Sequence, residues 1–161
     1  MTDGDLLDMI AELERQEQNL QFTAFDNDDA WALGSLLVRL GSERQLPITV
    51  DIRRHGHQLF HASLTGTAPD NDAWIERKVR VVERFNASSY LVGRRFAAKG
   101  DQLDHNHGVD PARYAIHGGS FPIRVRAVGV VGAVTVSGLR QADDHALVVE
   151  AIEAFLSDQR A

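Results

Sequence analysis

The stretch SFPIRVRAVGVVGAVTVSG, residues 120–138, decides the fold. It contains two runs rich in β-branched residues, over about 121–127 and 129–136, separated by a short break at Ala127–Gly129. Two such runs around a glycine-containing break predict a β-hairpin. Strands joined by a hairpin are antiparallel, so this stretch predicts antiparallel pairing.

The segment ITVDIRRHGHQLFHASL, residues 48–64, predicts a second hairpin. Apolar residues alternate along its first half, and Gly56 breaks the pattern before a run that ends at Leu64. A short apolar run from Leu20 to Phe25 adds a further predicted strand. Together these segments predict a single, mainly antiparallel, five-stranded sheet.

Helical periodicity fills most of the remaining chain. Apolar residues recur at helical spacing over residues 4–19, and a second helix follows the possible N-caps at 27–29. Two more helices precede the aperiodic segment 98–113, and one ends the chain. The order α-β-α-β-β-α-α-loop-β-β-α predicts one α+β domain over residues 1–161, with helices flanking the sheet.

Composition excludes several classes of function. The chain has 161 residues, a net charge of −6 and no cysteine. It therefore forms no disulfide and holds neither a thiolate nucleophile nor a cysteine-ligated metal. The negative charge argues against general nucleic-acid binding. No basic, apolar leader and no long apolar run is present, so we expect a cytoplasmic protein without a membrane partner.

The charge is unevenly distributed along the chain. Residues 1–30 carry −8, residues 31–126 carry +5 and residues 127–161 carry −3. Six of the seven histidines fall in the basic middle, and fifteen of the seventeen basic residues are arginines, which suit carboxylate and phosphate contacts. The basic middle is therefore where we expect a ligand site.

The strongest candidate binding residues surround the paired glycines. His117 precedes Gly118 and Gly119, and paired glycines allow backbone to approach a ligand closely. Arg124 and Arg126 alternate on the following strand and predict contacts to an anionic group. These five residues are the predicted site for a small anionic ligand, with His117 as proton donor or iron ligand.

Two histidine clusters are candidate metal sites. The first contains His55, His57 and His61, with Asp51 on the preceding strand. The second lies in the aperiodic loop and contains His105, His107 and Asp104, with Asp110 nearby. Imidazole and carboxylate groups can ligate zinc or non-haem iron, but neither spacing matches a specific metal motif.

Three motifs resemble the haem-degrading domain family, which includes GlcG-like and HbpS-like proteins. They are WIERKVRVVERFNASSY (74–90), HGGSFPI (117–123) and VSGLRQADDH (136–145). The nearest resemblance is to a branch catalogued as an uncharacterised protein family with yeast and bacterial members. It implies a profilin-like fold and a homo-oligomer. In GlcG-like and HbpS-like members one residue usually separates Gly-Gly from Pro, whereas two do here, so no haem ligand is carried over.

The resemblance implies haem as the candidate cofactor. We expect an oligomeric cytoplasmic protein that binds a small anionic molecule, haem being one such molecule. One alternative is a metal-dependent enzyme that uses the loop histidines. Another is a non-catalytic adaptor or chaperone-associated protein, in which the acidic N-terminal helix docks a partner. The sequence leaves open whether the protein is an enzyme.

Overall fold

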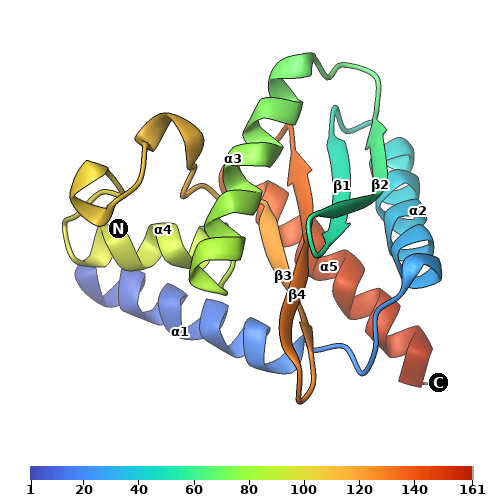
Figure 1. The fold of residues 1–161 in the computed structure, drawn as a ribbon, viewed down its shortest axis with the longest axis horizontal. Coiled ribbons are helices and arrows are strands. Elements are labelled where there is room, and N and C mark those ends of the chain that lie inside the picture. The colour runs from blue at the N-terminus through green and yellow to red at the C-terminus, as the bar shows by residue number, and fades with distance from the viewer. Residues whose placement is uncertain (161) are drawn as a thin grey trace.

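A computed structural model describes residues 1–160 and places helices on both faces of one sheet (Figure 1). The helices and strands, in chain order, are α1 (Asp3–Asn19), α2 (Asn27–Glu43), β1 (Thr49–Arg54), β2 (His57–Ser63), α3 (Pro69–Phe85), α4 (Ser89–Ala98), β3 (Ser120–Val125), β4 (Gly129–Ser137) and α5 (Gln141–Arg160). Two single 3₁₀ turns, His105–His107 and Pro111–Arg113, lie in the connection between α4 and β3.

The sheet is antiparallel, with strand order β2-β1-β4-β3. Both predicted hairpins form, and β1 pairs with β4 to join them. The α+β class and the single antiparallel sheet are therefore confirmed. The finer expectation of a profilin-like arrangement stays a prediction.

The prediction of five strands was wrong, because the sheet has four. The run from Leu20 to Phe25 meets the sheet at Phe22 alone, through an isolated parallel bridge to Val125. Phe22 exchanges backbone hydrogen bonds with Arg124 and Arg126 at 2.8 and 2.9 Å. Phe22 and Phe25 are buried in the core, so burial between two helices, and not strand pairing, explains why this run is apolar.

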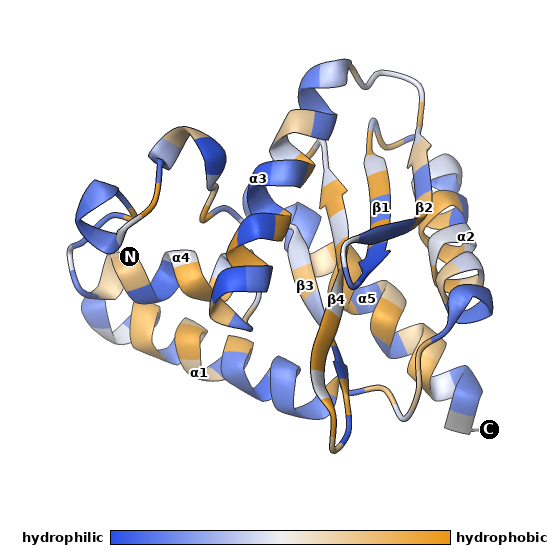
Figure 2. Cartoon of the chain, viewed as in Figure 1, coloured by the Kyte–Doolittle hydropathy of each residue, from blue (hydrophilic) through white to orange (hydrophobic). Residues whose placement is uncertain are grey.

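The two faces of the sheet differ in chemistry. Alternate strand residues point to opposite faces, and one set is apolar and packs against α2 and α5: Val50, Ile52, Phe121, Ile123, Val134 and Val136. The other set includes five buried polar residues: Thr49, Asp51, Ser120, Thr135 and Ser137. Helix α3 covers this face and is itself largely hydrophilic (Figure 2).

Burial of polar groups beneath α3 requires hydrogen bonds, because a buried group without one destabilises the fold. Ser120 and Thr135 hydroxyls lie 2.8 Å apart, and Thr49 and Ser63 hydroxyls 3.1 Å apart. Asp51 accepts a 2.8 Å hydrogen bond from the Arg53 Nε. The polar strand residues beneath α3 are therefore paired, and they lie beside the buried apolar Ile75, Val79 and Val82 of α3. This layer leads at one end into a pocket.

Candidate functional site

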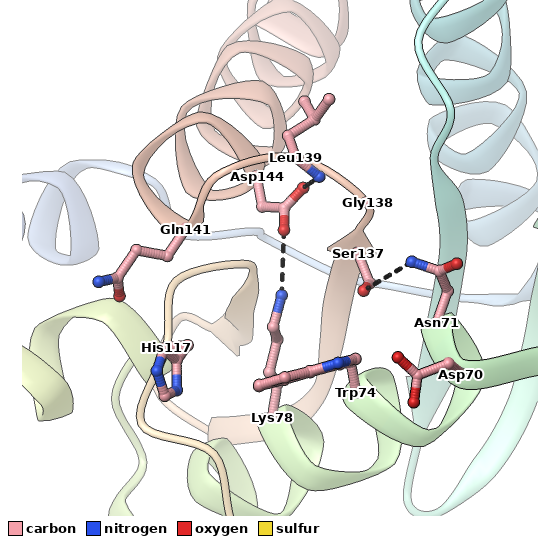
Figure 3. Close-up of a pocket in the computed structure, with 10 residues that line it drawn as sticks. All are labelled: Asp70, Asn71, Trp74, Lys78, His117, Ser137, Gly138, Leu139, Gln141 and Asp144. Carbon is pink, nitrogen blue, oxygen red and sulfur yellow. Dashed lines mark hydrogen bonds and ion pairs between the residues drawn. The ribbon is translucent and has the colours of Figure 1, made fainter. Parts of the chain in front are cut away.

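A pocket of about 310 Å³ opens where α3, the Gly-Gly segment, the end of β4 and the start of α5 meet (Figure 3). Trp74 and Lys78 reach it from α3, and His117 from the segment before β3. Ser137 ends β4 there, while Gln141 and Asp144 lie in the first turn of α5. Its volume is at the small end of the range for ligand pockets in proteins.

Lys78 and Asp144 form a buried ion pair in the wall of this pocket. Lys78 is 3% exposed and Asp144 is 2% exposed. The Lys78 Nζ donates to Asp144 Oδ2 at 3.1 Å and to the Val136 carbonyl at 3.2 Å. Asp144 Oδ1 also accepts from the Leu139 backbone N–H at 2.9 Å. The pair therefore ties α3 to the junction of β4 and α5.

Burial disfavours the charged form of each residue in this pair, and it therefore shifts both pKa values. It raises the pKa of Asp144 to about 6, although Lys78 and the Leu139 and Gly138 backbone N–H groups act in the opposite direction. It lowers the pKa of Lys78, which Asp144 opposes. Burial therefore brings the pKa values of the carboxyl and the amine closer together than in an exposed pair.

His117 lies exposed at the rim of the pocket. Its ring meets the Trp74 ring edge to face, with centroids 5.4 Å apart. Partial desolvation, and then the charges of Lys78, Arg77 and Arg94, lower the pKa of His117. At neutral pH the ring is therefore neutral, and one of its nitrogens carries a lone pair that can accept a proton or ligate a metal.

The paired glycines are packed against protein backbone. A Cβ on Gly118 would lie 2.2 Å from the Gln141 carbonyl oxygen, and one on Gly119 would lie 2.4 Å from that of Val136. Gly119 also has φ +140°, which favours glycine. The expected close approach is present, but its observed partners are the start of α5 and the end of β4. A role in ligand binding for these glycines stays a prediction.

The two predicted arginines do not line this pocket. Arg124 donates to the Asn86 carbonyl at 2.8 Å and to Glu17 at 3.4 Å, at the far end of β3 from His117. Arg126 is exposed in the turn between β3 and β4. Strand β3 ends at Val125, so Arg126 lies beyond the strand on which the alternation was predicted. The structure therefore does not bring His117 and these arginines together.

The hairpin histidines are separated in the structure. His55 and His57 are exposed at the turn, and His55 has φ +52°. His61 lies between two carboxylates, with Nδ1 2.8 Å from Asp51 and Nε2 3.1 Å from Asp72. Both of its ring nitrogens are therefore engaged by acids.

His107 in the loop has a similar environment. Its Nδ1 lies 3.1 Å from Asp104 and its Nε2 3.0 Å from Asp101, while His105 is exposed. Across residues 1–160, no three His, Asp or Glu side chains are grouped as a metal ion requires. Neither predicted metal site is therefore assembled in the described part of the chain.

Sequence reasoning missed the buried pair. Lys78 follows the apolar position Ile75 by three residues and precedes Val79 and Val82, so it falls within the inward stripe of α3. A lysine in such a stripe is a signal that the sequence offered. Asp144 carried no comparable signal, because an acid in the first turn of a helix is favourable on electrostatic grounds alone.

No helix within residues 1–160 is both long and apolar enough to cross a membrane. Fold and pocket together define an α+β protein with a small polar pocket between one helix and the end of its sheet. The chain matches the family described as "Haem degrading protein HbpS-like" over residues 25–153, and it belongs to this family. The resemblance found in the three sequence motifs is thereby confirmed.

Individual relatives agree with this assignment. A UPF0303 protein of Streptomyces coelicolor is 63% identical over 149 residues, which cover 92% of this chain and 94% of the relative. The crystal structure of the Ybr137w protein is similar with a TM-score of 0.85 and 34% identity, covering 94% of this chain and 90% of that one. The PduOC:heme complex shares the fold, with a TM-score of 0.68 and 17% identity, covering 81% and 94%.

Proposed function

We propose that this protein binds a small carboxylate- or phosphate-bearing molecule in the pocket of His117, Trp74 and Lys78. The observation that carries the proposal is the cationic surroundings of His117. Lys78, Arg77 and Arg94 lie close enough to lower its pKa, so these charges would attract an anion at the rim. The pocket carboxylates Asp70 and Asp144 oppose this attraction, and Asp144 is paired with Lys78. Trp74 supplies a flat apolar surface beside them.

Hydrogen-bonding groups around the pocket suit such a ligand. A neutral imidazole donates one N–H, and the Ser137 hydroxyl can donate as well as accept. The Gln141 Oε1 accepts from the Gly118 backbone N–H at 3.2 Å, which fixes the side chain and leaves its amide N–H₂ as a donor. Charge-assisted hydrogen bonds from such groups are the stronger kind.

Haem is the second candidate, because the family description names it and His117 offers an accessible imidazole. The residues fit part of this group: His117 suits the iron, and the neighbouring cations suit the propionates. They do not fit the macrocycle, which needs an apolar slot, because the pocket is small and its apolar side chains are those of Trp74 and Leu139. We therefore derive no chemical step through haem.

Two titrations of purified protein test the proposal. Lactate and inorganic phosphate are titrated while the fluorescence of Trp74 is followed in a Trp31→Phe background, and haem is titrated while the Soret band is followed. We expect anion binding that His117→Ala weakens about tenfold, the effect of losing one charge-assisted hydrogen bond. His57→Ala, at the exposed hairpin turn, is the matched control.

Each result has a distinct meaning. No response to lactate, phosphate or haem would overturn the proposal. Equal anion affinity in His117→Ala and the parent would remove His117 from the site. A Soret shift that is lost in His117→Ala would establish haem as the ligand. Cytoplasmic location and a homo-oligomeric state also belong to this proposal, and the helices of residues 1–160 are consistent with a protein that does not cross a membrane.

A further inference from the structure

The two lysines of this chain are in opposite environments. Fifteen of the seventeen basic residues are arginines, and only Lys78 and Lys99 are lysines. Lys99 is exposed at the end of α4, whereas Lys78 is buried in the pocket wall. An arginine side chain stays protonated under all ordinary conditions, while a lysine can lose its proton and become a nucleophile. The one buried cation of the pocket is thus also the one that can react.

Within residues 1–160, the Lys78 Nζ has two hydrogen-bond partners, which leaves one position without a partner. Its bonds to Val136 and Asp144 use two of the tetrahedral positions that the Cε atom leaves. Proton transfer along the bond to Asp144 leaves the lone pair facing Oδ2, and rotation about the Cε–Nζ bond then directs the lone pair to the third position while the two N–H groups face Val136 and Asp144. Gly119 borders the amine closely, since a Cβ there would lie 2.6 Å from the Nζ.

From this arrangement we infer that Lys78 forms an imine with the carbonyl carbon of a small anionic aldehyde or ketone, of the 2-oxo acid class, with Asp144 as its proton partner. The inference rests on the proposed anion site and specifies its substrate class. A carboxylate on the ligand would face the cations around His117, and its carbonyl carbon would face Lys78. The small volume of the pocket favours a substrate of few atoms.

The step balances without any further reactant. The Lys78 ammonium transfers a proton to the Asp144 carboxylate, giving an amine and a carboxylic acid. The amine lone pair attacks the carbonyl carbon, the C=O π bond breaks, and one proton moves from nitrogen to oxygen to give a carbinolamine. Asp144 then protonates the hydroxyl group, and water leaves as the C=N bond forms. The products are a protonated imine, one water molecule and the Asp144 carboxylate.

The pKa shifts of the pair support this step independently of the geometry. Burial lowers the pKa of Lys78, which increases the fraction of reactive amine at neutral pH. Burial also raises the pKa of Asp144 to about 6, which brings it into the range of an effective acid and base near neutrality. An exposed lysine such as Lys99 lacks this environment.

Reductive trapping tests the inference. The intact protein is incubated with pyruvate and sodium cyanoborohydride, and peptide mapping by mass spectrometry locates the reduced adduct. We expect labelling at Lys78 that exceeds labelling at Lys99 by about tenfold for each unit by which the lysine pKa is lowered. Lys99→Arg should retain the adduct and Lys78→Arg should lose it. Lactate, which has no aldehyde or ketone group, should give none.

Peptide mapping of the labelled wild-type protein gives a result even if the Lys78→Arg variant does not fold. Labelling confined to Lys99 or the Met1 amine would overturn the inference. If lactate still binds in the titration described above, the proposed anion site would be unaffected by that result. Labelling of Lys78 by acetone as fast as by pyruvate would overturn the assignment of an anionic substrate. Labelling of Lys78 without lactate binding would support the imine and count against a general anion site.

Discussion

Single buried polar residues hold together elements that are distant in sequence. His145 is buried on α5, and its Nε2 lies 2.8 Å from the Gln16 Oε1 on α1. Its ring lies between those of Tyr90 and Phe121, with centroids 5.0 and 5.9 Å away. Within residues 1–160 its Nδ1 has no hydrogen-bond partner. Burial lowers the pKa of His145 to about 4, so this histidine is neutral near pH 7.

This environment predicts an effect of pH on stability. The pKa of His145 is about 4 in the folded state and about 6.5 in the unfolded chain, so the unfolded state binds more protons between these values. Stability from this residue is therefore complete above pH 6.5 and is lost as pH falls toward 4. At pH 5 the loss amounts to about 2 kcal/mol.

Urea denaturation of wild type and His145→Gln at pH 7 and pH 5 measures this loss. Asp144, whose raised pKa stabilises the fold as pH falls, is present in both proteins, so the difference between them isolates His145. We compare the free energy of unfolding of the variant with that of wild type at each pH. The variant's value minus the wild-type value should rise by about 2 kcal/mol from pH 7 to pH 5. An unchanged difference between the two pH values would contradict the prediction.

At the scale of elements, the sequence predicted those whose patterns are local. The hairpins over 48–64 and 120–138 alternate and turn at small residues, and both form. The run from Leu20 to Phe25 has the same apolar character, but its burial depends on α2 and α5, which no local pattern shows. Likewise, His117 stood out because it precedes two glycines, whereas the Lys78–Asp144 pair joins residues 66 positions apart.

Helix α1 belongs to a second apolar cluster. This cluster is separate from the main core, which lies on the opposite face of the sheet with α2 and α5. Leu13 packs there with Val81, Leu91 and Val92, on α3 and α4. On the same helix the buried Glu17 accepts a 3.0 Å hydrogen bond from the Ser88 backbone N–H at the start of α4. The acidic N-terminal helix is thus part of the packed structure on one face.

Leu13→Ala should therefore destabilise the protein. Leu13 is 4% exposed, and removal of a buried leucine side chain costs about 2–5 kcal/mol. Leu7, on the same helix, is 60% exposed, so Leu7→Ala should change stability by no more than about 0.5 kcal/mol. Denaturant titration of both variants measures the contrast. Equal effects would show that α1 does not pack as described.

At the scale of the whole molecule, one edge of the sheet has no paired strand within residues 1–160. Strand β2 lies at the edge of the sheet, next to α2. Trp31 on α2 is 68% exposed, and its ring lies 5.8 Å from that of Phe60 on β2. An open edge beside an exposed aromatic side chain is a surface that proteins usually cover by association.

We accordingly expect the homo-oligomer proposed above to use this edge. Light scattering coupled to size exclusion should give a mass that is a multiple of that of one chain, and Trp31→Ala should lower it. Val128→Ala, at the exposed turn between β3 and β4, is the control and should leave the mass unchanged. A monomeric wild type would contradict the prediction, and an unchanged mass in Trp31→Ala would place the interface elsewhere.

The contrast between the two lysines has a consequence for enzymes that modify proteins. Lysine acetyltransferases and ubiquitin-like ligases need a side chain that reaches out of the fold, and on this protein Lys99 alone among the lysines does so. Lys78 is buried, so a bulky acylating enzyme does not reach it in the folded protein. An acetyl or ubiquitin-like group found on Lys78 would therefore mark molecules in which α3 had separated from the sheet.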